Sequence, residues 1–169
     1  MDAAALADRL AIQDTLHRYC RGLDRMDKAL ALSVFHAQSE VEYDHMYTGS
    51  GAAFIDWVWE QHRGMARHSH NITNLYVEID GARAASEAYA LVVLRFETEA
   101  GVSVVQNLGR YLDEWQCDGG RWTIRRRRYV HEFQETRLLA DDAIPAARTS
   151  SRRDGGDPSY ALKPTLNFQ

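Results

Sequence analysis

The sequence predicts a single α+β domain in which about three N-terminal helices cap a strongly curved antiparallel sheet, forming a cone-shaped α+β barrel. The first third of the chain has helical periodicity, and residues 70–133 hold four long stretches typical of strands. Turn signals such as Asp80-Gly81 and Asp118-Gly119-Gly120 separate those stretches. Helices that precede a meander of strands pack on one face of an antiparallel sheet. A curved sheet covered in this way encloses a cavity with one open mouth, which is a natural ligand pocket.

Composition narrows the class of protein. A chain of 169 residues with 45% apolar side chains has the size and core content of one domain. Its net charge of −4 provides no general positive field, although residues 125–128 form a local basic run. The N-terminus is acidic and amphipathic, unlike a signal peptide, and no apolar run approaches the ~20 residues of a membrane span. We therefore expect a cytoplasmic protein with no nucleic-acid or membrane partner.

The first helix is expected to end near Gly22, which places Asp24 at the mouth of whatever the helix covers. Its apolar stripe consists of Leu6, Leu10, Ile12, Leu16, Tyr19, Cys20 and Leu23. Further helices are expected over about 27–35 and 52–66, with a short strand over 39–47 between them.

The strands of the meander are expected over 70–80, 83–98, 102–116 and 121–133, so the folded domain should span 1–133. Residues 134–169 mix charge, Gly, Pro and Ser without periodicity. They form either a loose tail or an arm that closes over a pocket or a neighbouring subunit. The apolar side chains near the end of this extension are Tyr160, Leu162, Leu166 and Phe168.

Three segments carry a family resemblance. They are "LADRLAIQDTLHRYCRGLDRMD" at residues 6–27, "HNITNLYVEIDG" at 70–81 and "GRYLDEWQCDGGRWTIRRRRYV" at 109–130. In this order and spacing they resemble the polyketide-cyclase-like branch of the nuclear-transport-factor-2-like superfamily. Members of that branch include scytalone dehydratase, hexachlorocyclohexane dehydrochlorinase and bile-acid dehydratase. These enzymes eliminate small groups without a cofactor, whereas other members are isomerases, cyclases or non-catalytic binding proteins.

The resemblance implies a set of catalytic residues. An aspartate after the first helix pairs with a histidine that opens a strand, and these positions match Asp24 and His70. A tyrosine five residues before the aspartate matches Tyr19, and an arginine five residues after Trp122 matches Arg127. The further aspartate of the bile-acid enzyme and the second pocket histidine of the scytalone enzyme have no counterpart in "AYALVVLRF". The substrate should therefore be neither of theirs.

The chemistry of these residue types supports the same set. A neutral imidazole can remove a proton from carbon near pH 7, and a buried carboxylate can fix its tautomer and stabilise the imidazolium. We expect His70 to be the base and Asp24 its support. We also expect Tyr19 to donate to a leaving oxygen or a carbonyl, and Arg127 to hold developing negative charge. The predicted substrate contacts are Tyr43, Asn74, Trp59 and Tyr129.

The predicted activity is a cofactor-independent lyase that acts on a hydrophobic, oxygenated, cyclic or aromatic small molecule. An isomerase with the same base, a ligand-binding module, and a non-catalytic small subunit of a ring-hydroxylating dioxygenase are the alternatives. Asp24 could instead cap a turn, His70 could satisfy a strand end, and Tyr19 could simply pack. His68 and His70 form an H-x-H pair, but no third ligand falls at a matching position, so neither a metal nor another cofactor is predicted.

A homo-oligomer is also predicted, since a curved sheet leaves one face outside the cone. The apolar residues Val92, Val93, Leu94 and Val104 exceed the inward positions available. A symmetric trimer, or otherwise a dimer, would cover them.

Overall fold

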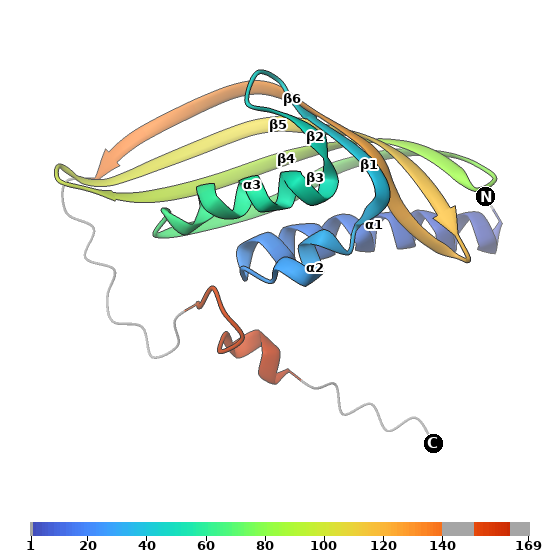
Figure 1. Cartoon of the computed structure of the whole chain (residues 1–169), viewed down its shortest axis with the longest axis horizontal. Helices are drawn as coiled ribbons and strands as arrows, with labels where there is room; N and C mark the ends of the chain where they lie inside the picture. Colours follow the sequence, from blue (N-terminus) through green and yellow to red (C-terminus); the bar gives the residue numbers. More distant parts are fainter. Residues whose placement is uncertain (1, 140–150, 163–169) are drawn as a thin grey trace.

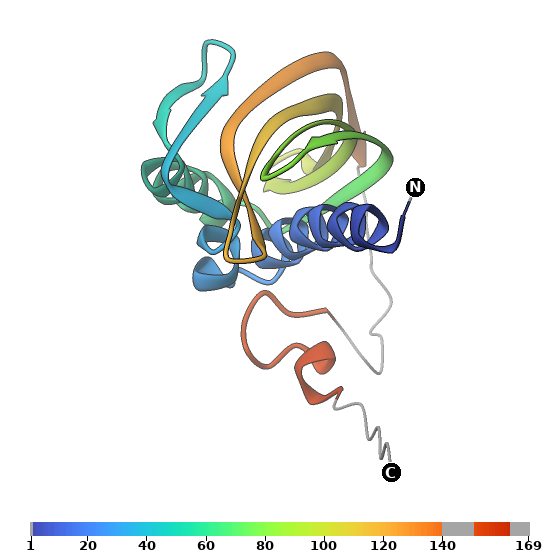
Figure 2. The same cartoon turned by 90° about the vertical axis from the view of Figure 1, so that its right-hand side faces the viewer.

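The computed structural model describes residues 2–139 and 151–162. The helices and strands, in chain order, are α1 (Ala3–Asp24), α2 (Lys28–Leu32), β1 (Phe35–Tyr43), β2 (Tyr47–Ser50), α3 (Gly51–Arg63), β3 (Arg67–Asp80), β4 (Arg83–Thr98), β5 (Gly101–Asp118), β6 (Arg121–Leu139) and the 3₁₀ helix η1 (Pro158–Ala161). The sheet arches over α1, α2 and α3, which lie on its concave side (Figures 1 and 2). No helix among the described residues has the length and apolarity needed to cross a membrane.

The predicted α+β cone is confirmed, with two differences in the sheet. Its strand order is β2-β1-β6-β5-β4-β3, so the two edges do not meet and the barrel stays open. Pairing is antiparallel except between β1 and β6, which run parallel. β1 and β6 are neighbours in the sheet although β1 follows the first two helices and β6 ends the meander, and the two strands run in the same direction. The sheet is therefore mixed.

Several element boundaries differ from the expectations. The second helix ends at Leu32 because Phe35 already begins β1. The single strand expected over 39–47 is instead split in two by a turn at Asp44, whose φ of 45° is left-handed. Residues 134–139 continue β6 rather than starting the extension. Of the extension, 151–162 are described, whereas Leu166 and Phe168 lie outside the described residues.

The core lies between α1 and the concave face of the sheet. α1 buries Ile12, Leu16, Tyr19, Cys20 and Leu23, at the helical spacing that the sequence indicates. The stripe is shorter than expected, because Leu6 and Leu10 are about half exposed at the N-terminal end of the helix. In that region Trp122 ties the helix to the last hairpin by donating its indole N–H to Asp8 at 2.8 Å.

Gly22 has a different role from the one predicted. α1 continues through it to Asp24, and the chain leaves the helix through Met26, whose φ of 52° is left-handed. A Cβ built on Gly22 would lie 2.6 Å from the backbone nitrogen of Ala31 and 2.8 Å from its Cα. Gly22 is therefore the point at which α2 packs directly against the backbone of α1.

The substitution Gly22→Ala tests this contact. Alanine favours a helix by about 1 kcal/mol over glycine. Here we nevertheless expect a net loss of roughly 1–3 kcal/mol in the free energy of unfolding, since the methyl group meets backbone that cannot move aside cheaply. Denaturant unfolding would measure the loss. Gly64→Ala is the matched control, because the nearest atom to its Cβ is the Gln61 carbonyl oxygen at 3.9 Å. Equal free energies for both variants would contradict the close contact.

Candidate functional site

Asp24 and His70 form a direct pair at the end of α1. The imidazole Nδ1 of His70 lies 2.7 Å from Oδ1 of Asp24, and the backbone N–H of His70 donates to both carboxylate oxygens at 3.1 Å. The side chains are only 6% and 16% exposed. Because a carboxylate accepts hydrogen bonds, Nδ1 carries the proton, and Nε2 keeps its lone pair. The pair thus has the arrangement of an oriented imidazole base.

His70 also lines a cavity of about 250 Å³ between the sheet, α1 and α3. The other lining residues are Tyr19, Leu23, Tyr43, Met46, Phe54, Trp57, Val58, Gln61, His62, Met65, Val92, Leu94, Asn107, Tyr111 and Tyr129. No Lys, Arg, Asp or Glu side chain from residues 2–139 or 151–162 belongs to this wall. The cavity is therefore aromatic and aliphatic, with a few neutral polar groups.

Tyrosines supply half of those polar side chains, and Gln61, His62, His70 and Asn107 supply the rest. The hydroxyls of Tyr19 and Tyr43 lie 3.4 Å apart, and the Tyr43 ring stacks on Tyr129 with 4.9 Å between centroids. The Tyr111 ring meets Tyr19 edge to face at 5.9 Å. Burial raises the pKa of Tyr19, and raises the pKa values of Tyr43 and Tyr111 further. The phenols therefore stay protonated at neutral pH and can donate hydrogen bonds to a bound molecule.

Arg127 lies behind this wall rather than in it. It is fully buried, and its Nε and Nη2 each lie 2.7 Å from a carboxylate oxygen of Asp113. Its guanidinium carbon is 4.4 Å from the Tyr19 ring centroid and 4.1 Å from that of Tyr111. Arg127 therefore does not line the cavity, and its role of holding developing negative charge stays a prediction.

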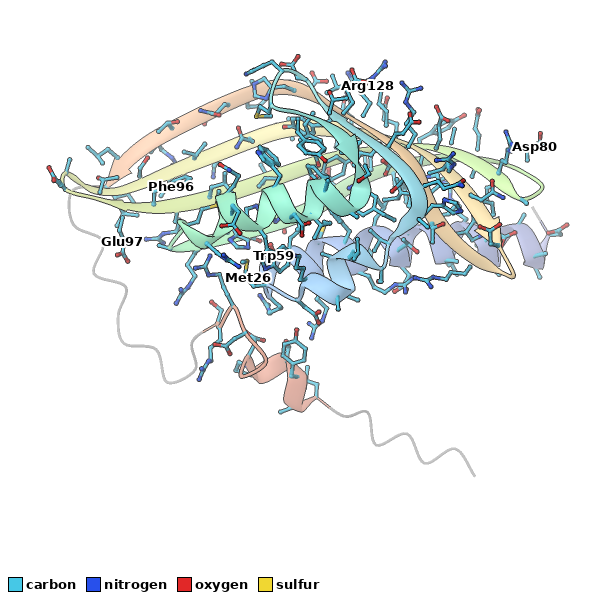
Figure 3. The ribbon with its side chains drawn as sticks, viewed as in Figure 1. Met26, Trp59, Asp80, Phe96, Glu97 and Arg128 are labelled. Atoms are coloured by element: carbon cyan, nitrogen blue, oxygen red, sulfur yellow. The ribbon has the colours of Figure 1, made fainter. Side chains whose placement is uncertain are left out.

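A bulge in β6 determines which arginine faces inward. The pairing of β5 with β6 shifts between Glu114 and Trp115, and this shift leaves Arg125 without a partner in the register. Arg126 and Arg128 then point to solvent on the convex face, where Figure 3 shows Arg128. Arg127 is the member of the run that turns into the core.

The predicted substrate contacts divide evenly. Tyr43 and Tyr129 line the cavity, whereas Trp59 and Asn74 do not. Trp59 is buried in the core on another side of α3 from Trp57, which takes the wall position. Asn74 is exposed in β3, within a register shift that lies between Ile72 and Leu75. Contact of any of the four with a substrate stays a prediction.

His62 is a cavity residue that the sequence reasoning missed. It follows Phe54 and Val58 at helical spacing on α3, so its position on the inner face of that helix was available from periodicity. The His62 ring lies 4.2 Å from that of His68 and 5.3 Å from that of His70. Burial, followed by the neighbouring His70 and His68, lowers the pKa of His62 to about 2, and burial also lowers the pKa of His68. Both rings are therefore neutral near pH 7.

The described residues hold no group of three or more His, Cys, Asp or Glu side chains placed to bind a metal ion. In the histidine cluster, Nδ1 of His70 bonds Asp24, and Nε2 of His68 lies 2.9 Å from the carbonyl oxygen of Leu23. Because a carbonyl only accepts, that Nε2 carries a proton. One ring nitrogen of each histidine in the H-x-H pair therefore donates a hydrogen bond to a residue of α1.

His62 should make the fold sensitive to acid. Its pKa of about 2 in the folded protein lies well below the ordinary value of 6.5 that it regains on unfolding. The unfolded state therefore binds the extra proton as pH falls below 6.5, and stability declines by up to about 1.4 kcal/mol per pH unit for this group. Urea unfolding of the wild type and His62→Gln at pH 7, 6 and 5 should show a shallower decline in the variant. Identical slopes would contradict a neutral buried His62.

Comparison with known proteins places the fold. A structure of hexachlorocyclohexane dehydrochlorinase LinA type 2 superposes with a TM-score of 0.75 at 19% identity, over 87% of this chain and 100% of that one. A scytalone dehydratase-like protein from Novosphingobium aromaticivorans gives 0.71 at 20% identity, over 89% and 100%. Rv3472, a protein of unknown function from Mycobacterium tuberculosis, gives 0.66 at 26% identity, over 85% and 80%.

A comparison with functionally curated proteins gave no match. The sequence of residues 4–128 matches the SnoaL-like domain, and this match covers most of the chain, including Asp24 and His70. The chain therefore belongs to the SnoaL-like domain family within the nuclear-transport-factor-2-like superfamily.

Proposed function

We propose that this protein is a cofactor-independent lyase and that the cavity beside His70 is its active site. The observation that carries the proposal is the 2.7 Å contact between Asp24 and Nδ1 of His70, which leaves Nε2 as an unprotonated base beside an apolar cavity. The names of the structural neighbours, a dehydrochlorinase and a scytalone dehydratase-like protein, agree with elimination chemistry.

In the proposed reaction, Nε2 of His70 takes a proton from a carbon atom of the substrate. The electrons of that C–H bond form a double bond as water, halide or a small carbon fragment leaves from the neighbouring atom. Asp24 keeps the ring in the reactive tautomer and stabilises the imidazolium that forms. A phenol of the wall, Tyr19 or its hydrogen-bonded neighbour Tyr43, donates to the leaving group or to a carbonyl.

The cavity also restricts the substrate. No formally charged side chain of the described wall could pair with a carboxylate or phosphate, and burying such a group unpaired is costly. A volume of about 250 Å³ suits a small ring compound, and the Tyr43–Tyr129 stack provides a flat face for it. We therefore propose an uncharged, hydrophobic, oxygenated or halogenated cyclic molecule. An isomerase would use the same base and return the proton to another carbon, so product analysis distinguishes the two.

A double-mutant cycle on turnover tests the pair. His70→Ala removes the base and should lower turnover on the order of 10²–10⁴-fold. Asp24→Asn should leave the fold intact but let His70 adopt the wrong tautomer. Because the residues act as a unit, the double variant should be little worse than His70→Ala alone. Candidate substrates are uncharged cyclic alcohols, hydroxylated aromatics and halides.

Thermal unfolding of the same variants provides the control. If Asp24 only caps a turn, Asp24→Asn should lower the melting temperature and leave turnover nearly unchanged. The effects of Asp24→Asn and His70→Ala on turnover should then be independent and multiply in the double variant. That pattern would remove the central pair of the lyase proposal. A ligand-binding module would instead bind cyclic ligands without turnover in any variant.

We also propose that the protein is a symmetric homo-oligomer, a trimer or otherwise a dimer. Of the four residues first considered, Val92 and Leu94 line the cavity, Val104 is buried and Val93 is half-buried, so the most exposed apolar side chains of the sheet lie elsewhere. Phe133, Leu138 and Leu139, near the end of β6, are 53%, 59% and 37% exposed. Phe133 and Leu139 share one face of β6, whereas Leu138 lies on the other, and a second copy could cover the face that carries Phe133 and Leu139. Light scattering at micromolar concentration should give a molecular mass that is a multiple of the chain mass. The Phe133→Glu variant should give a lower molecular mass than the wild type. A monomeric wild type would contradict the proposal.

A further inference from the structure

Segment 151–162 packs against the C-terminal ends of α1 and α3, the two helices that contribute side chains to the candidate site. It lies below α1 and α2, on the side away from the arch of the sheet (Figures 1 and 2). Its contacts fall on residues that flank Asp24. Asp157, which is buried, pairs with Arg25 at 3.2 Å, Ser159 accepts from Arg21 at 3.2 Å, and Tyr160 donates to Asp27 at 3.3 Å.

Arg153 extends from this segment to the histidine cluster. Its Nη1 donates to the backbone carbonyl of His62 at 2.8 Å and lies 3.4 Å from Nδ1 of His68. Burial lowers the pKa of Arg153, and no carboxylate of the described residues forms an ion pair with it. The guanidinium is thus directed at a carbonyl and an imidazole rather than at an acid.

His68 connects Arg153 to α1. Its protonated Nε2 donates to the carbonyl oxygen of Leu23 at 2.9 Å, and that oxygen, in the last turn of the helix, also accepts from the backbone N–H of Met26 at 3.0 Å. Its Nδ1 is then an acceptor, which suits the Nη1–H of Arg153. Asp24 is the next residue after Leu23. A continuous path therefore runs from Arg153 through His68 and Leu23 to the carboxylate that holds His70.

From these contacts we propose that Arg153 and His68 are positioning residues for the Asp24–His70 pair, and that segment 151–162 is a strap that fixes the end of α1. The strap fixes His68 as a hydrogen-bond link between Arg153 and the end of α1, so that the Asp24 carboxylate stays directed at Nδ1 of His70. The catalytic consequence rests on the proposed function, whereas the structural part does not depend on any substrate.

The structural part is tested by ¹⁵N NMR of the histidine side chains. In the wild type, His68 should show the Nε2–H tautomer and His70 the Nδ1–H tautomer. The groups that face His68 are His62, His70, Asp24 and Arg153. Arg153→Ala removes one cation and admits water, so the titration of His68 should move to higher pH and the Nδ1–H signal of His70 should broaden by faster exchange.

Arg152→Ala is the matched control, because among the described residues that exposed side chain pairs only with Asp154. It should leave both histidine signals unchanged. Arg153→Lys keeps the charge and one donor, and should restore the signals in part. Unchanged His68 and His70 spectra in Arg153→Ala would overturn the proposal, whether or not the protein is a lyase.

Turnover then tests the catalytic consequence. Arg153→Ala should lower kcat up to roughly 100-fold with little change in KM, because it displaces Asp24, whereas the Arg153 side chain does not line the cavity and contacts His62 only at its backbone carbonyl. Combined with Asp24→Asn, it should add almost nothing, since it acts through that carboxylate. Multiplicative effects would overturn the positioning role. Wild-type protein without turnover, but with the expected NMR shifts, would reject the lyase proposal and leave the strap standing.

Discussion

A carboxylate at the C-terminus of a helix is electrostatically unfavourable, because the last carbonyl groups already carry partial negative charge. Asp24 occupies that position in α1. β3 compensates by directing both the backbone N–H and the Nδ1–H of His70 at the carboxylate. α1 and β3 must therefore meet at a fixed register. The cavity wall on either side of the pair depends on that contact.

The second buried ion pair, formed by Arg127 and Asp113, lies outside the cavity wall. Arg127 and Asp113 are fully buried, and such a pair is tolerated because its two hydrogen bonds are short and parallel. The rings of Tyr19 and Tyr111 separate the guanidinium from the cavity. The cavity wall therefore presents phenol rings rather than the guanidinium itself. In the proposed reaction, these phenols would stabilise developing negative charge without a cation that attracts anions from solution.

The features that follow from local pattern could be predicted from the sequence, and the others depend on distant strands. The bounds of β4 were predicted from alternation and turn signals, and the approach of Asp24 to His70 was implied by family resemblance. The parallel pairing of β1 with β6 leaves no mark in either strand. The inward turn of Arg127 depends on a bulge at Arg125 that alternation does not show. The prediction that the helix ends at Gly22 was wrong, because glycine is favoured both at helix ends and where two backbones pack closely, as here against Ala31.

The three histidines illustrate how one residue type acquires different properties from its surroundings. His70 donates to a carboxylate, His68 donates to a helix carbonyl, and His62 has a buried Nδ1 with no hydrogen-bond partner among the described residues. With rings 4.2–5.7 Å apart, a proton on one disfavours a proton on the others. Asp24 is the carboxylate that contacts the group, and of the three rings it bonds that of His70. That asymmetry singles out His70, whose ring is oriented by a carboxylate and lies beside the cavity.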